Sequence, residues 1–118
     1  QRHFNEPLID AAIVGMEQQM NGAFSTSELA LSLHVSYRTL HRRFQAVTGM
    51  APLAYMHALR VERAKELLEQ TRHSVAQIAA AVGYDDETSF RRIFARHTGL
   101  SPAEYRKRFR RANTADSL

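Results

Sequence analysis

Two segments of the chain carry arginine and small polar residues at the spacing of one helix face. The candidates are Arg38, His41 and Arg42 in the first segment and Thr88, Ser89, Arg91 and Arg92 in the second. Residues three and four positions apart lie on the same side of a helix, so each segment presents one polar face. The planar guanidinium makes bidentate hydrogen bonds with guanine or phosphate, and threonine can bond a base or contact a thymine methyl group. The residue types therefore point to base-edge recognition on duplex DNA.

Catalytic chemistry has much weaker support in the sequence. The six histidines stand at 3, 34, 41, 57, 73 and 97, and no two have the i, i+4 spacing of a zinc-binding helix. Asp85 and Asp86 are adjacent carboxylates, but an N-cap at a helix start explains them. Because the chain has no cysteine and no glycine-rich phosphate loop, we expect no metal, no cofactor and no enzymatic activity.

An RNA-binding or protein-binding helical module is the third class to weigh. RNA recognition usually stacks bases on exposed aromatic rings. Here Phe44, Phe90 and Phe94 fall on apolar helix sides and Tyr84 lies at a turn, so we expect these rings to be packed inside. RNA is therefore the weaker prediction, whereas contacts with a protein partner stay open.

Every periodic segment is helical, and the sequence predicts an all-α fold of about seven helices. The expected helices cover about 7–20, 26–33, 37–48, 52–70, 75–82, 87–98 and 102–111, followed by a polar tail that frays. Capping boxes are expected at Ser25/Glu28, Ser74/Gln77 and Ser101/Glu104, with Ser36 and either Asp85 or Asp86 as further caps. Gly22, Gly49 and Gly99 mark helix ends. In the first helix the apolar positions at helical spacing are Leu8, Ala11, Ala12, Met16 and Met20.

One helical unit occurs twice in the chain. Residues 39–60 align with 89–110 at an offset of 50, and the identities are Arg42/Arg92, Phe44/Phe94, Thr48/Thr98, Gly49/Gly99, Pro52/Pro102, Tyr55/Tyr105 and Arg60/Arg110. Upstream the offset is 49, and Leu29, Ala30, Leu33 and Val35 pair with Ile78, Ala79, Val82 and Tyr84. Each copy is a short helix, a tight turn, a second helix, a glycine stop and a helix opened by proline. A short helix, a tight turn and a second helix form the helix-turn-helix pattern.

The second helix of each copy has an apolar stripe opposite its polar face. The expected stripes are Leu40, Phe44 and Val47 in one copy and Phe90, Ile93 and Phe94 in the other. The helix predicted over 52–70 would span roughly 28 Å at 1.5 Å per residue. Successive major-groove faces of B-DNA lie roughly 34 Å apart. A rigid helix of this length could set two DNA-reading helices one turn of DNA apart.

The charge of the chain favours a polyanionic partner. Its 118 residues fit one domain, its net charge is +4, and 14 of its 16 basic residues are arginine. Residues 87–111 carry eight basic against two acidic residues, whereas residues 1–28 carry one against four. No apolar run reaches the roughly 18 residues of a membrane span. Since the chain begins with glutamine and has no signal peptide, we expect a fragment of a longer protein.

The second copy contains the most specific motif. It consists of Ile78-Ala79, Val82-Gly83-Tyr84, Ser89-Phe90, Arg92, Phe94, Gly99, Pro102 and Tyr105-Arg106. With these residues the chain resembles, over about 8–110, the C-terminal DNA-binding domain of the AraC/XylS family of bacterial transcription regulators. The resemblance implies a DNA-binding domain over 1–118, built from helix-turn-helix units at about 8–50 and 74–111 and a linker helix at 52–70. It also implies that the intact protein has an N-terminal sensing domain, which this chain lacks.

The resemblance also assigns residues and partners. Base contacts fall on Arg38, His41 and Arg42 and on Thr88, Arg91 and Arg92, with Glu87 and Ser89 beside them. Weaker candidates for phosphate contacts are Ser36, Arg43, Arg60, Arg63 and the run from Arg106 to Arg111. The implied partners are double-stranded DNA, bound by this fragment as a monomer, and RNA polymerase. No membrane partner is expected, and the implied location is the bacterial cytoplasm.

Overall fold

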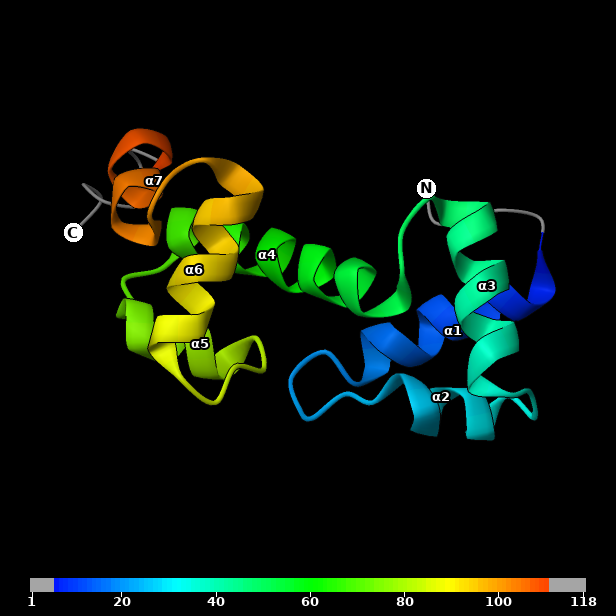
Figure 1. Ribbon diagram of the computed structural model, residues 1–118. Coiled ribbons are helices and arrows are strands. Elements are labelled where there is room, and N and C mark those ends of the chain that lie inside the picture. Colours follow the sequence, from blue (N-terminus) through cyan, green and yellow to red (C-terminus); the bar gives the residue numbers. More distant parts are fainter. Residues whose placement is uncertain (1–5, 111–118) are drawn as a thin grey trace. The chain divides into compact units, whose positions relative to one another are not determined.

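Residues 6–110 are the part of the chain that the computed structural model describes, and they form seven α-helices (Figure 1). The helices are α1 (Pro7–Gln18), α2 (Thr26–Ser32), α3 (Tyr37–Thr48), α4 (Pro52–Gln70), α5 (Val75–Ala81), α6 (Glu87–Thr98) and α7 (Pro102–Phe109). The all-α prediction is confirmed, and every helix begins at the predicted residue. Four helices end one or two residues early. Arg111 and the polar tail lie outside the described residues.

Side-chain caps explain where α2, α3, α5 and α7 begin. The Ser36 hydroxyl accepts the N–H of Thr39 at 3.0 Å and so caps α3. Complete capping boxes open α5 and α7, formed by Ser74 with Gln77 and by Ser101 with Glu104. At α2 the Ser25 hydroxyl accepts the N–H of Glu28 at 3.2 Å. Each bond satisfies one of the four N–H groups that a helix start leaves without a partner in the helix.

The chain divides into two compact units within α4, between His57 and Ala58. In the first unit, α1, α2 and α3 all contact one another. In the second unit, α6 contacts both α5 and α7. The helix predicted as a linker contributes to both units, because Met56 is buried in the first, and Ala64 and Leu68 lie in the core of the second.

The core of the second unit is aromatic at its centre. Tyr84, Phe90, Phe94 and Tyr105 contact one another in sequence, with ring centroids 5.5 to 5.7 Å apart. The aliphatic members of this core are Val61, Ala64, Leu68, Ile78, Ala79 and Val82. Because Phe90 and Phe94 are fully buried, the rotation of α6 about its axis is fixed, and its opposite side faces solvent.

The sequence repeat is also a repeat of contacts. The Phe44 and Tyr55 rings meet edge to face with centroids 5.2 Å apart, as do the Phe94 and Tyr105 rings at 5.5 Å. The hydroxyls of Thr48 and Thr98 donate to the carbonyls of Phe44 and Phe94 at 2.8 and 2.9 Å. Gly49 and Gly99 then end α3 and α6 with φ angles of 81° and 80°, a left-handed conformation that glycine adopts at little cost. The identities between the copies therefore specify one helix–glycine–helix corner twice.

The register of α1 differs from the prediction. The buried stripe is Ile9, Ala12, Ile13 and Met16, whereas Ala11 is exposed and Leu8 and Met20 are half-buried. Residues 11–14 are all apolar, so periodicity alone does not decide which side of this helix packs inward. Gly22 also lies beyond the helix end, since α1 stops at Gln18 and Gln19 forms the C-cap.

Candidate nucleic-acid interface

The exposed side of α3 carries the first group of predicted base contacts. Arg38 and Arg42 are exposed and His41 is half-buried. Leu40 and Phe44, on the opposite side, are fully buried. The structure therefore brings the three candidates to one face of α3 and leaves their polar groups accessible to a partner.

A surface hollow of about 400 Å³ lies on this face, lined by Tyr37, Arg38, His41 and Arg42. The rings of Tyr37 and His41 are in contact, with centroids 5.7 Å apart. Tyr37 is 51% exposed, and its phenol can donate and accept hydrogen bonds. Tyr37 is not among the predicted contacts, although the repeat aligns it with Glu87 at the first residue of α6.

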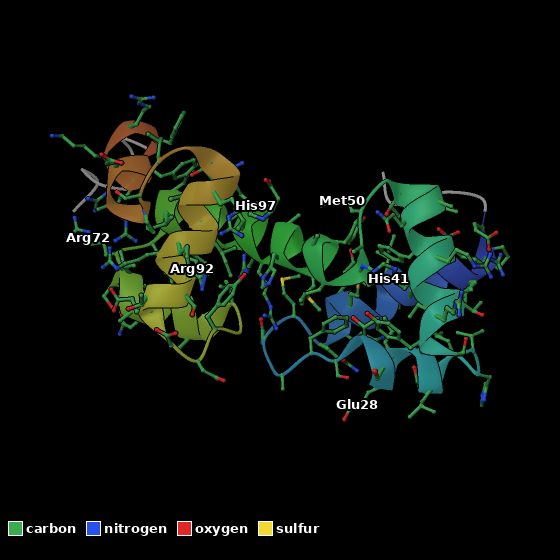
Figure 2. The ribbon with its side chains drawn as sticks, viewed as in Figure 1. Glu28, His41, Met50, Arg72, Arg92 and His97 are labelled. Atoms are coloured by element: carbon green, nitrogen blue, oxygen red, sulfur yellow. The ribbon has the colours of Figure 1, made fainter. Side chains whose placement is uncertain are left out.

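The second group lies on α6, and Figure 2 shows His41 on α3 and Arg92 on α6. Its exposed members are Thr88, Arg91 and Arg92, and Ser89 is half-buried. Phe90 and Phe94 are buried on the other side of the helix. The arrangement of polar face and aromatic anchor is thus the same on both helices, as the repeat predicts.

Asp86 caps this helix. Its carboxylate accepts the N–H of Thr88 at 2.9 Å and the hydroxyl of Ser89 at 2.6 Å. These bonds, with the Ser89 hydroxyl first among them, lower the pKa of Asp86 below its usual value, and the charge of Arg92 adds to the effect. Ser89 therefore stabilises the start of α6 in the free protein, and its hydroxyl must exchange this partner before it can donate to a base.

The two arginines of α6 differ in their surroundings. Arg91 is paired with Glu87 one turn earlier, and its Nε donates to Glu87 Oε2 at 2.7 Å. Arg92 is exposed and makes no ion pair within residues 6–110. On α6 it is therefore Arg92, at the position equivalent to Arg42, whose guanidinium is accessible without first opening an ion pair.

Arg60 does not have the surroundings of a phosphate contact. Only 6% of the residue is exposed, and its guanidinium lies 5.1 Å from the centroid of the Tyr84 ring. A buried guanidinium stacked on an aromatic ring stabilises the packing of that region. The predicted phosphate role of Arg60 therefore does not fit the structure.

Arg106 is held by the end of α4. Its Nε and Nη2 donate to the carbonyls of Leu68 and Thr71 at 3.1 and 3.2 Å. Burial, and then the charge of Arg110, lower the pKa of Arg106. Unpaired carbonyls at a helix C-terminus favour a cation, so Arg106 caps α4 rather than extending towards a phosphate.

The remaining phosphate candidates are more accessible. Arg43 is 41% exposed and pairs with Glu6 at 2.6 Å, and Arg63 is 51% exposed and pairs with Glu66 at 2.9 Å. Ser36 is exposed, with its hydroxyl committed to the α3 cap. Lys107 and Arg108 are exposed on α7, and Arg111 lies outside the described residues.

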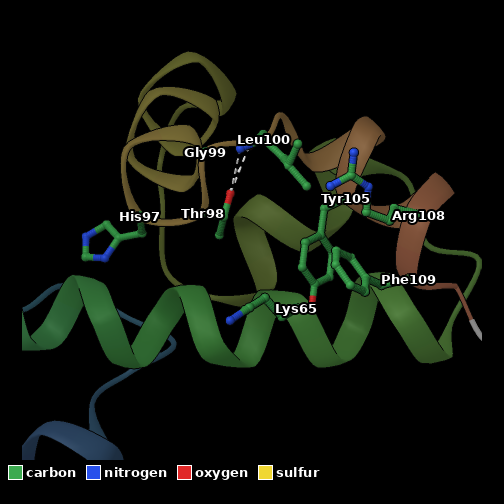
Figure 3. Close-up of a pocket in the computed structure, with 8 residues that line it drawn as sticks. All are labelled: Lys65, His97, Thr98, Gly99, Leu100, Tyr105, Arg108 and Phe109. Atoms are coloured by element: carbon green, nitrogen blue, oxygen red, sulfur yellow. Dashed lines mark hydrogen bonds between the residues drawn. The ribbon is translucent and has the colours of Figure 1, made fainter.

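A second hollow, of about 610 Å³, lies at the corner between α6 and α7 (Figure 3). Its lining is Lys65, His97, Thr98, Gly99, Leu100, Tyr105, Arg108 and Phe109. Lys65 is engaged there, because its Nζ pairs with Glu62 at 2.9 Å and lies 6.0 Å from the Tyr105 ring centroid. This hollow is built from the last turn of α6, whereas the base-contact candidates lie on the first turns.

Other kinds of site have little support in the described part of the chain. Residues 6–110 contain no cluster of three or more histidine, aspartate, glutamate or cysteine side chains that could hold a metal ion. None of the helices within this range is long and apolar enough to cross a membrane.

The comparison with known proteins covers most of the chain. A family model described as a helix-turn-helix domain matches residues 29–108. The MmsAB operon regulatory protein of Pseudomonas aeruginosa is 34% identical over 102 residues, which cover 86% of this chain and 33% of that protein. The transcriptional activator RclR of Escherichia coli is 35% identical over 104 residues, covering 88% of this chain and 37% of that protein. The chain thus spans about a third of the length of these relatives.

Solved structures give the same result for the fold. An AraC-type transcriptional regulator from Chromobacterium violaceum is 31% identical, with a TM-score of 0.84 over 92% of this chain and 96% of the other. The DNA-binding domain of AdpA, solved with a target DNA, is 32% identical, with a TM-score of 0.80 over 95% and 97% of the two chains. The two curated relatives are both regulators of transcription. The chain therefore belongs to the AraC family, as the helix-turn-helix DNA-binding domain of a bacterial transcription regulator.

Proposed function

We propose that the chain binds a specific duplex DNA site as a monomer, with α3 and α6 in successive major grooves. The observation that carries this proposal is the pair of exposed polar faces on α3 and α6, each opposite two fully buried residues, within one chain. Helix-turn-helix proteins usually reach two half-sites by dimerising. Two copies in one chain make a dimer unnecessary.

The length of α4 supports the proposal that the two half-sites lie one turn of DNA apart. This helix has 19 residues, from Pro52 to Gln70. At a rise of 1.5 Å per residue it extends over about 28 Å, and successive major-groove faces are about 34 Å apart.

The proposed base contacts centre on two equivalent arginines. Arg42 and Arg92 are exposed at the same position of the repeat, where each can bond the O6 and N7 atoms of guanine. Arg38, His41 and Tyr37 extend the contact surface on α3, and Thr88, Ser89 and Arg91 extend it on α6. Arg43, Arg63, Lys107 and Arg108 remain as the candidates for phosphate contacts, so binding should weaken steeply with salt.

The activity of the intact protein is part of the same proposal. RclR is a transcriptional activator, and AdpA was solved with its target DNA. By analogy, the intact protein would carry a sensing domain before this chain and activate transcription in the bacterial cytoplasm through a contact with RNA polymerase.

Selection of bound sequences from random duplex DNA, followed by footprinting of the recovered site, tests the proposal. We expect two short half-sites about one helical turn apart, protected by one copy of the chain. The stoichiometry should be measured in the same samples by sedimentation. Protection of a single half-site, or binding that requires two copies, would contradict the proposal.

A further inference from the structure

The start of α6 is acidic, whereas the start of α3 is not. Asp85, Asp86 and Glu87 are consecutive at the start of α6, and residues 34–48 contain no acidic residue. The two helices are otherwise copies of one unit, so the difference is specific to this position. Carboxylates repel the phosphates of DNA, so Glu87 weakens the electrostatic attraction of α6 for DNA although it suits the helix dipole.

Glu87 is not needed to cap its helix. Asp86 supplies the N-cap through Thr88 and Ser89. Glu87 instead engages Arg91, whose Nε and Nη2 both donate to the same carboxylate oxygen. The two side chains are 38% and 46% exposed, and an exposed ion pair opens at little cost when better partners are offered. The ion pair therefore restricts the position of Arg91 but can open when DNA offers other partners.

Cytosine and guanine together offer partners to both members of this pair. In the major groove, the N4 amino group of cytosine donates to a carboxylate, and the O6 and N7 atoms of guanine accept from arginine. A C·G base pair presents these groups side by side. A thymine in place of cytosine presents the O4 acceptor, which repels the carboxylate.

We propose that Glu87 determines specificity by holding Arg91 away from phosphates until a C·G base pair accepts both side chains. This inference rests on the DNA binding proposed above for α6. On unmatched DNA, Glu87 keeps its ion pair with Arg91, so the helix gains no phosphate contact and is repelled. The α3 face, with Arg38 and Arg42 and no carboxylate, has no such brake on phosphate contacts, so this additional discrimination belongs to the start of α6.

The test replaces Glu87 by glutamine, which removes the charge and keeps the size. The probes are the duplex selected with the unmodified chain, the same duplex with T·A at each C·G pair of the α6 half-site in turn, and a random-sequence duplex of equal length. Affinities are measured by fluorescence anisotropy over a series of salt concentrations. The unmodified chain should prefer C·G over T·A at one position by about tenfold.

Glu87→Gln should bind the random duplex more tightly and lose most of the preference at that position. Because Arg91 then reaches one more phosphate, the slope of log affinity against log salt on random DNA should steepen by about 0.9. The double variant Glu87→Gln with Arg91→Gln should return to the original slope. Arg91→Gln alone should lose the C·G preference without gaining affinity for random DNA, which keeps the test valid if Glu87→Gln folds poorly.

Glu62→Gln is the matched control. It removes the same charge and releases Lys65 from a 2.9 Å pair on α4. If Glu62→Gln gains as much affinity for the random duplex as Glu87→Gln does, the effect of Glu87 is one of net charge and the inference is overturned. The inference is also overturned if Glu87→Gln keeps both the salt slope and the C·G preference of the unmodified chain. If the unmodified chain binds no duplex at all, it is the proposed function that fails.

Discussion

The guanidinium of Arg60 lies over the ring of Tyr84, 5.1 Å from its centroid. Arg60 belongs to α4, and Tyr84 belongs to the turn between α5 and α6. The contact therefore ties the long helix to the turn that positions the second recognition helix. Burial raises the pKa of the Tyr84 phenol, and the positive charge of Arg60 partly opposes this shift.

Arg60→Ala should destabilise the second unit without changing how DNA binding responds to salt. Loss of a desolvated cation–π contact should lower the free energy of unfolding by about 1–2 kcal/mol. Thermal unfolding and a salt titration of DNA affinity measure the two effects separately. The control is Arg63→Ala, an exposed residue whose loss should change stability by less than about 0.5 kcal/mol. If Arg60→Ala keeps its stability but its DNA affinity depends less steeply on salt, Arg60 is a phosphate contact after all.

Tyr105 makes the stability of the second unit depend on pH in the alkaline range. Its hydroxyl donates to the Glu69 carboxylate on α4. Burial, followed by this bond and the charge of Glu69, raises the pKa of Tyr105 well above its usual value. In the unfolded chain the phenol ionises near pH 10, so the folded state holds the proton more tightly. The stabilisation is therefore complete below about pH 10 and is lost as the pH rises towards the folded-state pKa.

Tyr105→Phe should lower the free energy of unfolding at neutral pH by about 1 kcal/mol, through loss of the hydrogen bond. It should also flatten the decline in stability above about pH 10. Urea unfolding at a series of pH values from neutral to alkaline measures both. Tyr84→Phe is the comparison, because Tyr84 also has a raised pKa but no bond to Glu69. An alkaline decline as steep as in the unmodified chain would show that Tyr105 does not carry it.

The helix starts could be predicted from the sequence because their causes are local. Pro52 at the first position of α4, or Ser74 with Gln77 at α5, needs no distant residue to act. The positions of Arg60 and Arg106 could not be predicted in this way. Their partners Tyr84 and Leu68 are 24 and 38 residues away, and a surface arginine and a buried one look the same in a helical pattern.

In the turn of the first helix-turn-helix unit, the repeat gives information about backbone conformation. His34 has a φ of 61°, and the aligned Gly83 of the second unit has a φ of 99°. The glycine in one copy thus indicates a left-handed residue in the other. The apolar pairs of the repeat on either side of His34 do not show this, because an apolar pattern carries no information about φ.

His34→Gly should therefore raise the free energy of unfolding of the first unit by about 0.5 kcal/mol. Relief of the left-handed conformation, about 1–2 kcal/mol, is partly offset by the greater entropy of glycine in the unfolded chain. Gly83→Ala is the reciprocal change and should destabilise the second unit. Chemical unfolding of both variants provides the measurement. A loss of stability in His34→Gly would indicate that the imidazole stabilises the C-terminus of α2.

Base contacts and core packing are carried by different residues of the two recognition helices. Arg42 and Arg92 are exposed at equivalent positions, whereas Phe94 is fully buried. If each arginine makes a bidentate base contact, Arg42→Ala or Arg92→Ala should cost about 1–3 kcal/mol of binding free energy and relax specificity at one or two base pairs. Both variants should melt close to the unmodified chain, since an exposed arginine adds little to a core.

Phe94→Ala is the contrasting variant, because it should destabilise the fold by about 3–5 kcal/mol through a cavity between α6 and its neighbours. Its loss of DNA binding would follow from unfolding and would not be confined to particular base pairs. The rival role for Arg92 is an electrostatic contact with Asp86, whose pKa it helps to lower. In that case Arg92→Ala would lower the melting temperature and weaken binding to every sequence equally. Melting curves and affinities for a panel of single-base variants of the selected site, measured on the same preparations, distinguish these outcomes.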